Sequence, residues 1–131
     1  MEPQMNADER RLNEITEKVI GCAYAVSNEL GCGFLEKVYA NSMFVELTRA
    51  GIQATAEARI EIRYRNVVVG EYYADLLVAD SVIVEIKAVK SLDDVHTAQC
   101  LNYLRATGIR VCLLINFGSP KVEIRRIVNK L

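Results

Sequence analysis

Two apolar runs that carry three charged residues constrain the fold of this chain more than any other stretch. Residues 73–87 read YADLLVADSVIVEIK, with a polar turn-forming pair in the middle. Both runs are apolar at consecutive positions, which indicates the two strands of a β-hairpin, covered on both faces. Asp75, Glu85 and Lys87 lie inside these runs. A charge in such surroundings is costly, so these residues need a metal ion, one another or a wet cleft.

Residue parity decides whether the three charges can form one site. Glu85 and Lys87 are two positions apart on one strand and therefore project from the same face. Asp75 joins them if the hairpin loop holds an odd number of residues, such as 79–81, whereas a two-residue loop would send it to the other face. We expect the odd loop, with Asp75 opposite Glu85.

Two carboxylates beside a lysine would suit Mg²⁺, which proteins hold by one or two carboxylates while water and phosphate complete its shell. The lysine could then orient or activate a water, or neutralise charge on a phosphate. A Glu-x-Lys pair alone is typical of a solvated strand face. The apolar flanks and the upstream aspartate favour the metal site.

Composition limits the class of protein. At 131 residues the chain is expected to be one domain, 1–131, with a flexible N-terminal segment at 1–7. No apolar run is long enough to span a membrane and the start lacks the features of a signal peptide, so a cytoplasmic protein without membrane contact is expected. The net charge of −1 argues against a strong sequence-independent grip on nucleic acid, but it leaves room for a local basic cleft.

The cysteines predict no metal site. Cys22, Cys32, Cys100 and Cys112 show no C-x-x-C spacing, and a single histidine accompanies them. Neither zinc nor an iron–sulfur cluster is therefore indicated, and reduced, mostly packed thiols are expected.

Hydrophobic periodicity predicts the element order α-α-β-β-β-α-β-β. The expected helices cover 8–30, 35–50 and a segment that opens with a capping box at 91–94 and ends before Gly108. The expected strands cover 58–64, 67–79, 82–89, 109–117 and 122–128, after a separate extended piece at 52–56. A right-handed crossover would lay 109–117 parallel to 82–89, giving a mixed sheet flanked by helices.

Further polar residues lie on the predicted helices. Glu36 falls in the first turn of the second helix, where an acidic residue is often only a favourable charge at the helix N-terminus. His96, Gln99 and Tyr103 share one face of the third helix, so all three could point at the same place. A lone histidine or glutamine is usually a surface residue, and only the shared face makes these residues candidates for a site.

The motif at 33–39, GFLEKVY, resembles that of the GxxExxY family, and residues 12–128 are similar to this family in element order and motif spacing. The family belongs with the PD-(D/E)XK nuclease superfamily, so the resemblance implies an α/β (α+β) restriction-endonuclease-like αβββαβ core. It implies that Asp75 binds metal, that Glu85 and Lys87 form the E-x-K pair, and that Glu36 adds an acidic group. Gln99-x-x-x-Tyr103 is similar to the Q-x-x-x-Y motif of RecB-type nucleases, whose helix faces the active site.

Two features depart from the pattern. Residue 74 is alanine where the superfamily's name has proline. The cysteine cluster of some RecB-type relatives is missing, so no iron–sulfur cofactor is implied.

The leading hypothesis is a phosphodiesterase that acts on DNA with Mg²⁺ or Mn²⁺. Asp75, Glu85 and the backbone carbonyl near Ile86 would hold the metal, and Glu36 would add a ligand directly or through water. Lys87 would position or activate water, while Gln99 and Tyr103 would position the substrate or Lys87. A homodimer would explain how both strands of a duplex are cut.

The alternative hypothesis is a non-catalytic module that keeps the nuclease fold and binds nucleic acid or protein. The weak net charge favours this alternative, and the intact set of candidate catalytic side chains disfavours it. A purely structural protein would leave the charges inside apolar strands unexplained.

Overall fold

The computed structural model describes residues 6–129, which form three helices and five strands. In chain order these are α1 (Ala7–Leu30), α2 (Glu36–Arg49), β1 (Ala54–Tyr64), β2 (Val67–Val78), β3 (Val82–Lys87), α3 (Asp94–Thr107), β4 (Val111–Asn116) and β5 (Glu123–Val128). The predicted element order is confirmed. Most of the flexible segment expected at 1–7 lies outside the described residues, but Asn6 caps α1, because its side chain accepts a hydrogen bond from the Glu9 N–H.

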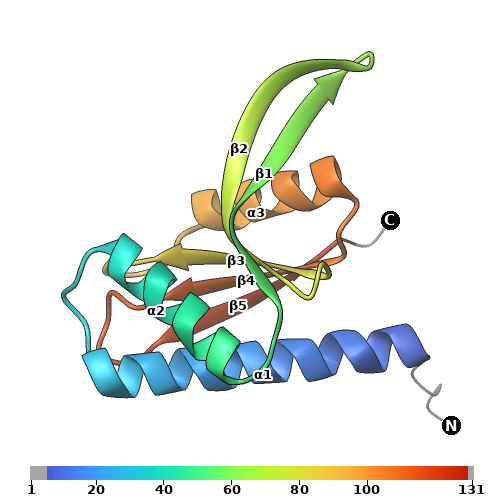
Figure 1. The fold of residues 1–131 in the computed structure, drawn as a ribbon. Coiled ribbons are helices and arrows are strands. Elements are labelled where there is room, and N and C mark those ends of the chain that lie inside the picture. The colour runs from blue at the N-terminus through green and yellow to red at the C-terminus, as the bar shows by residue number, and fades with distance from the viewer. Residues whose placement is uncertain (1–5, 130–131) are drawn as a thin grey trace, which may run out of the picture.

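The strands form one mixed sheet in the order β1-β2-β3-β4-β5. β3 and β4 are parallel, linked through α3, and the other neighbours are antiparallel. Helices α1 and α2 cover one face, and α3 covers the other (Figure 1). This is the α+β, nuclease-like architecture that the sequence predicted.

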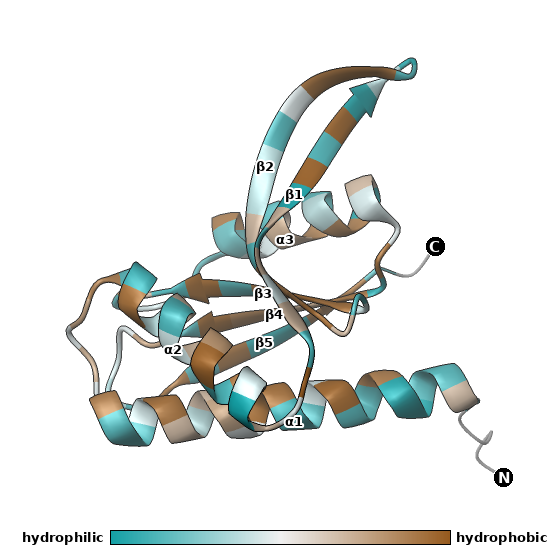
Figure 2. Ribbon diagram, in the orientation of Figure 1, coloured by the Kyte–Doolittle hydropathy of each residue, from teal (hydrophilic) through white to brown (hydrophobic). Residues whose placement is uncertain are grey.

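The central strands β3 and β4 are buried on both faces, as their continuous apolar runs indicated (Figure 2). On β3, Val82, Val84 and Ile86 pack toward α1 and α2, whereas Ile83 packs with residues of α3. Side chains alternate along a strand, so Glu85 belongs to the α3 face. A carboxylate thus enters one of the two apolar layers.

The β1–β2 hairpin reaches beyond the sheet as a two-stranded arm (Figure 1). β2 pairs with β1 along almost its whole length, from Val78 to Val67, but it pairs with β3 only from Leu76 to Val78. At the tip, Arg65 and Asn66 are both left-handed, which confirms the predicted turn.

Several predicted boundaries differ from the structure, and three of these differences have a local cause. The pieces at 52–56 and 58–64 belong to one strand, because the pairing with β2 is interrupted at the left-handed Glu57 and then resumes in the same register. β3 stops at Lys87 and not at 89, because the Val89 N–H donates to the Asn116 side chain. The cap of α3 is Asp93 with His96 in the third helical position, so the capping box starts two residues later than the sequence suggested.

The four cysteines are free thiols, of which Cys22, Cys100 and Cys112 are buried and Cys32 is exposed. This agrees with the prediction of reduced, mostly packed cysteines. Among residues 6–129, no helix is long and apolar enough to cross a membrane.

Candidate active site

The loop between β2 and β3 has three residues, as parity required. Val78 pairs with Val82 and Leu76 with Val84, so the register brings Asp75 opposite Glu85. Ala79 and Asp80 take left-handed backbone angles, and the Ser81 N–H closes the turn by donating to the Val78 carbonyl at 3.0 Å. The local hairpin geometry therefore brings the two carboxylates together on neighbouring strands.

Asp75 and Glu85 link β2 to β3 by side-chain hydrogen bonds at the point where the backbone pairing of the two strands ends. The Asp75 N–H donates to Glu85 Oε1 at 3.1 Å, and the Ile86 N–H donates to Asp75 Oδ2 at 2.7 Å. Each carboxylate thus accepts from a backbone N–H that would otherwise donate to a carbonyl of the neighbouring strand. One oxygen of each group is engaged in this way, and within residues 6–129 no hydrogen bond engages the other.

The surroundings of the two carboxylates favour their neutral forms. Glu85 is 5% exposed. Burial first, and then the charge of Asp75, raises the pKa of Glu85 to about 8. Burial likewise raises the pKa of Asp75, while the nearby Lys87 and Lys37 act in the opposite direction. Two like charges held together in an apolar layer are the donor set that a divalent cation would neutralise, so these residues fit such an ion.

Lys87 is the last residue of β3 and is half-buried. It pairs with Asn116 of β4, and its carbonyl accepts from the Phe117 N–H at 2.8 Å. Its positive charge lowers the pKa of both Asp75 and Glu85, so the ammonium group lies near them.

Asn116 holds the segment that follows Lys87, a role that sequence reasoning missed. The Asn116 amide accepts from the Val89 N–H and donates to the Val89 carbonyl, both at 2.9 Å. It also contacts Gly118 and Glu123. A fully buried asparagine at the end of an apolar strand was the available signal, because a buried amide must be satisfied.

On α3, Gln99 and Tyr103 are joined by a hydrogen bond from Gln99 Nε2 to the Tyr103 hydroxyl, 2.8 Å long. Tyr103 is buried and lies against the ring of Tyr72, with centroids 5.7 Å apart. Burial first, and then the charge of Glu85, raises the pKa of Tyr103 to about 12. Tyr103 is therefore near enough to Glu85 for its charge to act there, whereas the third residue of the predicted face, His96, accepts a hydrogen bond in the helix cap.

The 33–39 motif shapes the turn that begins α2. Gly33 has φ +111°, a conformation that favours glycine, and the Tyr39 hydroxyl donates to the Gly31 carbonyl at 2.7 Å and accepts from the Phe34 N–H at 3.2 Å. The Tyr39 ring stacks on Phe117, with centroids 4.7 Å apart. These contacts fix the start of α2 at Glu36.

The charge of Glu36 contributes to the raised pKa of Glu85, so Glu36 faces the same region. Among the described residues, however, no three His, Cys, Asp or Glu side chains are close enough together to hold a metal ion. The structure therefore brings Asp75 and Glu85 together as a pair and leaves Glu36 outside that immediate group.

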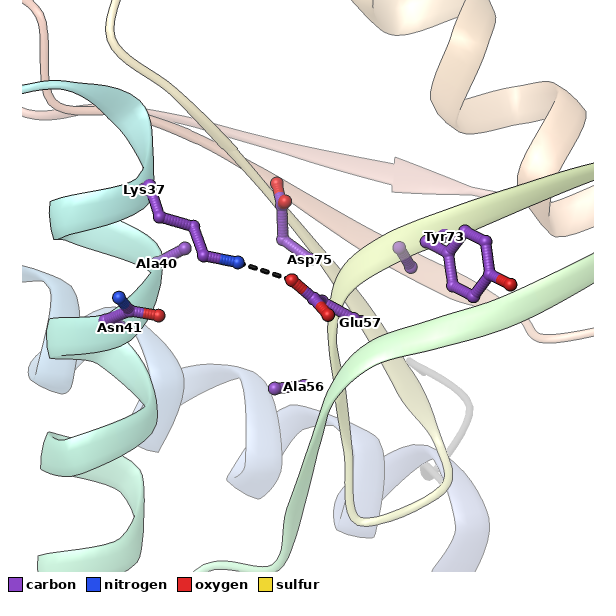
Figure 3. A pocket seen from close by; sticks show the side chains of 8 residues that line it. Lys37, Ala40, Asn41, Ala56, Glu57, Tyr73 and Asp75 are labelled. Atoms are coloured by element: carbon purple, nitrogen blue, oxygen red, sulfur yellow. Dashed lines mark hydrogen bonds and ion pairs between the residues drawn. The ribbon is translucent and has the colours of Figure 1, made fainter.

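Lys37 and Glu57 also border the site, and sequence reasoning singled out neither. They form an ion pair across a cavity of about 380 Å³ that Asp75 helps to line (Figure 3). The available signal for Lys37 was its position directly after Glu36. Glu57 gave none, because its left-handed backbone lies where the pairing of two strands is interrupted, which local periodicity does not predict.

Comparison with known proteins identifies the family and the fold. The family model described as the PD-(D/E)XK nuclease superfamily matches residues 13–127. The chain belongs to this superfamily. The matched range includes the paired carboxylates, Lys87 and the helix that carries Gln99 and Tyr103. No curated protein matches the chain.

Two solved structures share the PD-(D/E)XK fold of this chain. One is described as the crystal structure of SSO0001, with a TM-score of 0.54 and 22% identity over 93% of this chain and 61% of that one. The other is an alkaline exonuclease, LHK-Exo, from Laribacter hongkongensis, with a TM-score of 0.53 and 16% identity over 72% of this chain and 55% of that one. The chain therefore spans only about half to three fifths of these larger proteins.

Proposed function

We propose that this PD-(D/E)XK protein is a metal-dependent phosphodiesterase that cleaves DNA. The observation that carries the proposal is the Asp75–Glu85 pair, two carboxylates held together in an apolar layer with Lys87 beside them. Such an arrangement costs stability unless a cation neutralises it. Perturbed ionisable groups of this kind cluster at functional sites.

In this proposal, Asp75, Glu85 and the backbone carbonyl of Ile86 hold Mg²⁺ or Mn²⁺, and Glu36 contributes directly or through water. When bound, the cation would polarise the phosphate and make a bound water more acidic. Lys87 orients the attacking water or neutralises charge that develops on the phosphate. The Tyr103 hydroxyl is protonated near neutral pH, as its raised pKa reinforces, so with Gln99 it can donate to the substrate or position Lys87.

The finer assignment is also part of the proposal. The turn built by Gly33 and Tyr39 supports membership of the GxxExxY family, and the Gln99–Tyr103 hydrogen bond supports a role like that of the Q-x-x-x-Y motif. We further propose that the protein acts in the cytoplasm and that a homodimer cuts both strands of a duplex.

A second candidate function is a non-catalytic module that binds nucleic acid or protein. One specific observation favours it, because Asp75 and Glu85 each accept a backbone N–H from the opposite strand and so have a structural role without metal. The net charge of −1 gives no broad electrostatic attraction to phosphates.

The test is to incubate the purified protein with single- and double-stranded DNA and RNA, in Mg²⁺, Mn²⁺ or EDTA. The proposal requires metal-dependent DNA cleavage by the wild type that is lost in Lys87→Ala. Wild-type protein that binds metal and nucleic acid but cleaves no substrate would support the binding module instead. Cleavage that Lys87→Ala leaves unchanged would indicate another active site or a contaminating nuclease.

A further inference from the structure

The cavity beside Asp75 opens between α2 and the start of the β1–β2 hairpin. It is lined by residues of both elements, namely Lys37, Ala40, Asn41, Ala56, Glu57, Tyr73, Ala74 and Asp75. Figure 3 shows Lys37 reaching from α2 toward Glu57, with Asp75 next to this pair. The polar groups of the cavity are therefore shared between its two walls and the proposed metal site.

Lys37 is the cation of this cavity. Its ammonium group bonds to the Glu57 carboxylate and is close enough to Asp75 for its charge to act there. The Lys37 side chain is 64% exposed, so a ligand can reach it from solvent. Asn41 lines the same cavity and can add an amide donor.

Glu57 holds Lys37 at some conformational cost. Its φ of +52° is uncommon for a residue other than glycine, and it is skipped in a register that pairs Ala56 with Leu76 and Ala58 with Ala74. An ion pair between side chains this exposed contributes little stability. Stability therefore does not explain why a residue in this uncommon conformation directs its carboxylate at Lys37, but holding that lysine beside Asp75 does.

We propose that this cavity binds a phosphate of the nucleic-acid strand next to the phosphate that is cleaved, with Lys37 and Asn41 as donors. Glu57 is the counter-ion that this phosphate replaces. The inference rests on the proposed function, because the strand must pass Asp75 to be cut there. It adds a substrate site outside the Asp75, Glu85 and Lys87 group.

If phosphate replaces Glu57 as the partner of Lys37, substitutions of Lys37 and of Glu57 should change the affinity for DNA in opposite directions. Lys37→Ala removes a charged donor and should weaken binding about tenfold. Glu57→Gln removes the competing carboxylate and should strengthen binding. Lys37→Arg should restore most of the affinity, and the double variant should resemble Lys37→Ala.

Binding can be measured separately from cleavage. The probe is fluorescently labelled DNA, single- and double-stranded, titrated in Mg²⁺ with each variant placed in a Lys87→Ala background. The salt dependence gives a second readout, because loss of one phosphate contact should lower the slope of log affinity against log salt by about 0.7–0.9. Lys18→Ala, an exposed lysine on α1, is the matched control and should change neither quantity.

Cleavage by the same variants with Lys87 intact separates this inference from the proposed function. We expect Lys37→Ala to raise KM with little change in kcat, as expected for lost binding that is equal in ground and transition states. If the wild type cleaves DNA but Lys37→Ala binds like Lys18→Ala, the phosphate site is refuted and the nuclease proposal stands. If Lys37→Ala and Glu57→Gln both weaken binding without a change in salt slope, the pair is a structural link. A wild type that neither binds nor cleaves refutes both proposals.

Discussion

Strand β2 carries charged residues in two very different settings. In the arm, Glu71 and Glu61 share ion pairs with Arg59, Glu61 also pairs with Arg63, and all these side chains are at least partly open to solvent. In the body, Asp75 of the same strand faces Glu85, a group of the same sign, and both bond to backbone N–H groups.

The two settings differ in whether the surroundings favour the charged form of the carboxylate. The pKa of Glu71 is lowered, chiefly by hydrogen bonds from Tyr73 and Arg59, so its ionised form is stabilised. The pKa of Glu85 is raised, so its ionised form is destabilised. An ionisable group held in an apolar layer, where its charged form is unfavourable, points to function, whereas a balanced charge on the surface needs no such explanation.

The largest expected difference between the two regions is catalytic. Lys87→Ala should lower DNA cleavage on the order of 10²-fold or more, because it removes a positioned group at the reacting centre. Arg63→Ala removes a cation from the arm and should leave kcat nearly unchanged. Initial rates under saturating substrate, with circular dichroism to verify folding, would show whether the effect is confined to the body.

The next difference concerns pH. The pKa of Glu85 in the folded protein, about 8, is above its ordinary value of 4.5, so the folded state binds the extra proton between these values. The free energy of unfolding should therefore fall as pH rises from about 4.5 to 8, by at most about 1.4 kcal/mol per unit. Urea unfolding in EDTA should show this slope in the wild type.

Substitutions identify the group responsible for the slope. Glu85→Gln should flatten it, and Glu71→Gln should not, because the pKa of Glu71 is shifted the other way. A wild-type stability that does not change over this range would mean that Glu85 ionises freely, and the contrast with the arm would disappear.

A third difference between the arm and the sheet is expected in how metal ions affect stability. Asp75→Asn relieves repulsion and keeps an oxygen that can accept from the Ile86 N–H, so the apoprotein should be as stable as the wild type or more stable. The same change should reduce the rise in Tm that millimolar Mg²⁺ or Mn²⁺ confers. Glu61→Gln in the arm should leave that rise intact. A wild-type Tm indifferent to metal, with Asp75→Asn clearly destabilised, would identify a structural aspartate.

The smallest effect is expected in the arm itself. Arg63→Ala breaks one exposed ion pair with Glu61 and should change the unfolding midpoint in urea by little more than experimental error. A large loss of stability would show that the arm's charges are as strongly coupled as those of the body.

The sequence was sufficient for the element order and for the pairing of Asp75 with Glu85, because both follow from local periodicity and loop parity. It was not sufficient where the structure depends on contacts between distant segments. The interruption of pairing at Glu57 requires β1 to lie beside β2, and the hydrogen bonds of Asn116 require the segment after β3 to approach β4. The cap of α3 was misplaced because Ser91 and Asp93 are both good capping residues.

The three-residue loop at 79–81 also has an evolutionary consequence. Because side chains alternate along β2 and β3, a single-codon insertion or deletion in this loop would turn Asp75 away from Glu85 without changing any residue of the site. Two codons would leave the pair facing. Homologous genes that retain the chemistry should therefore vary in length at this point in steps of two codons, and a step of one should mark lineages in which the site has decayed.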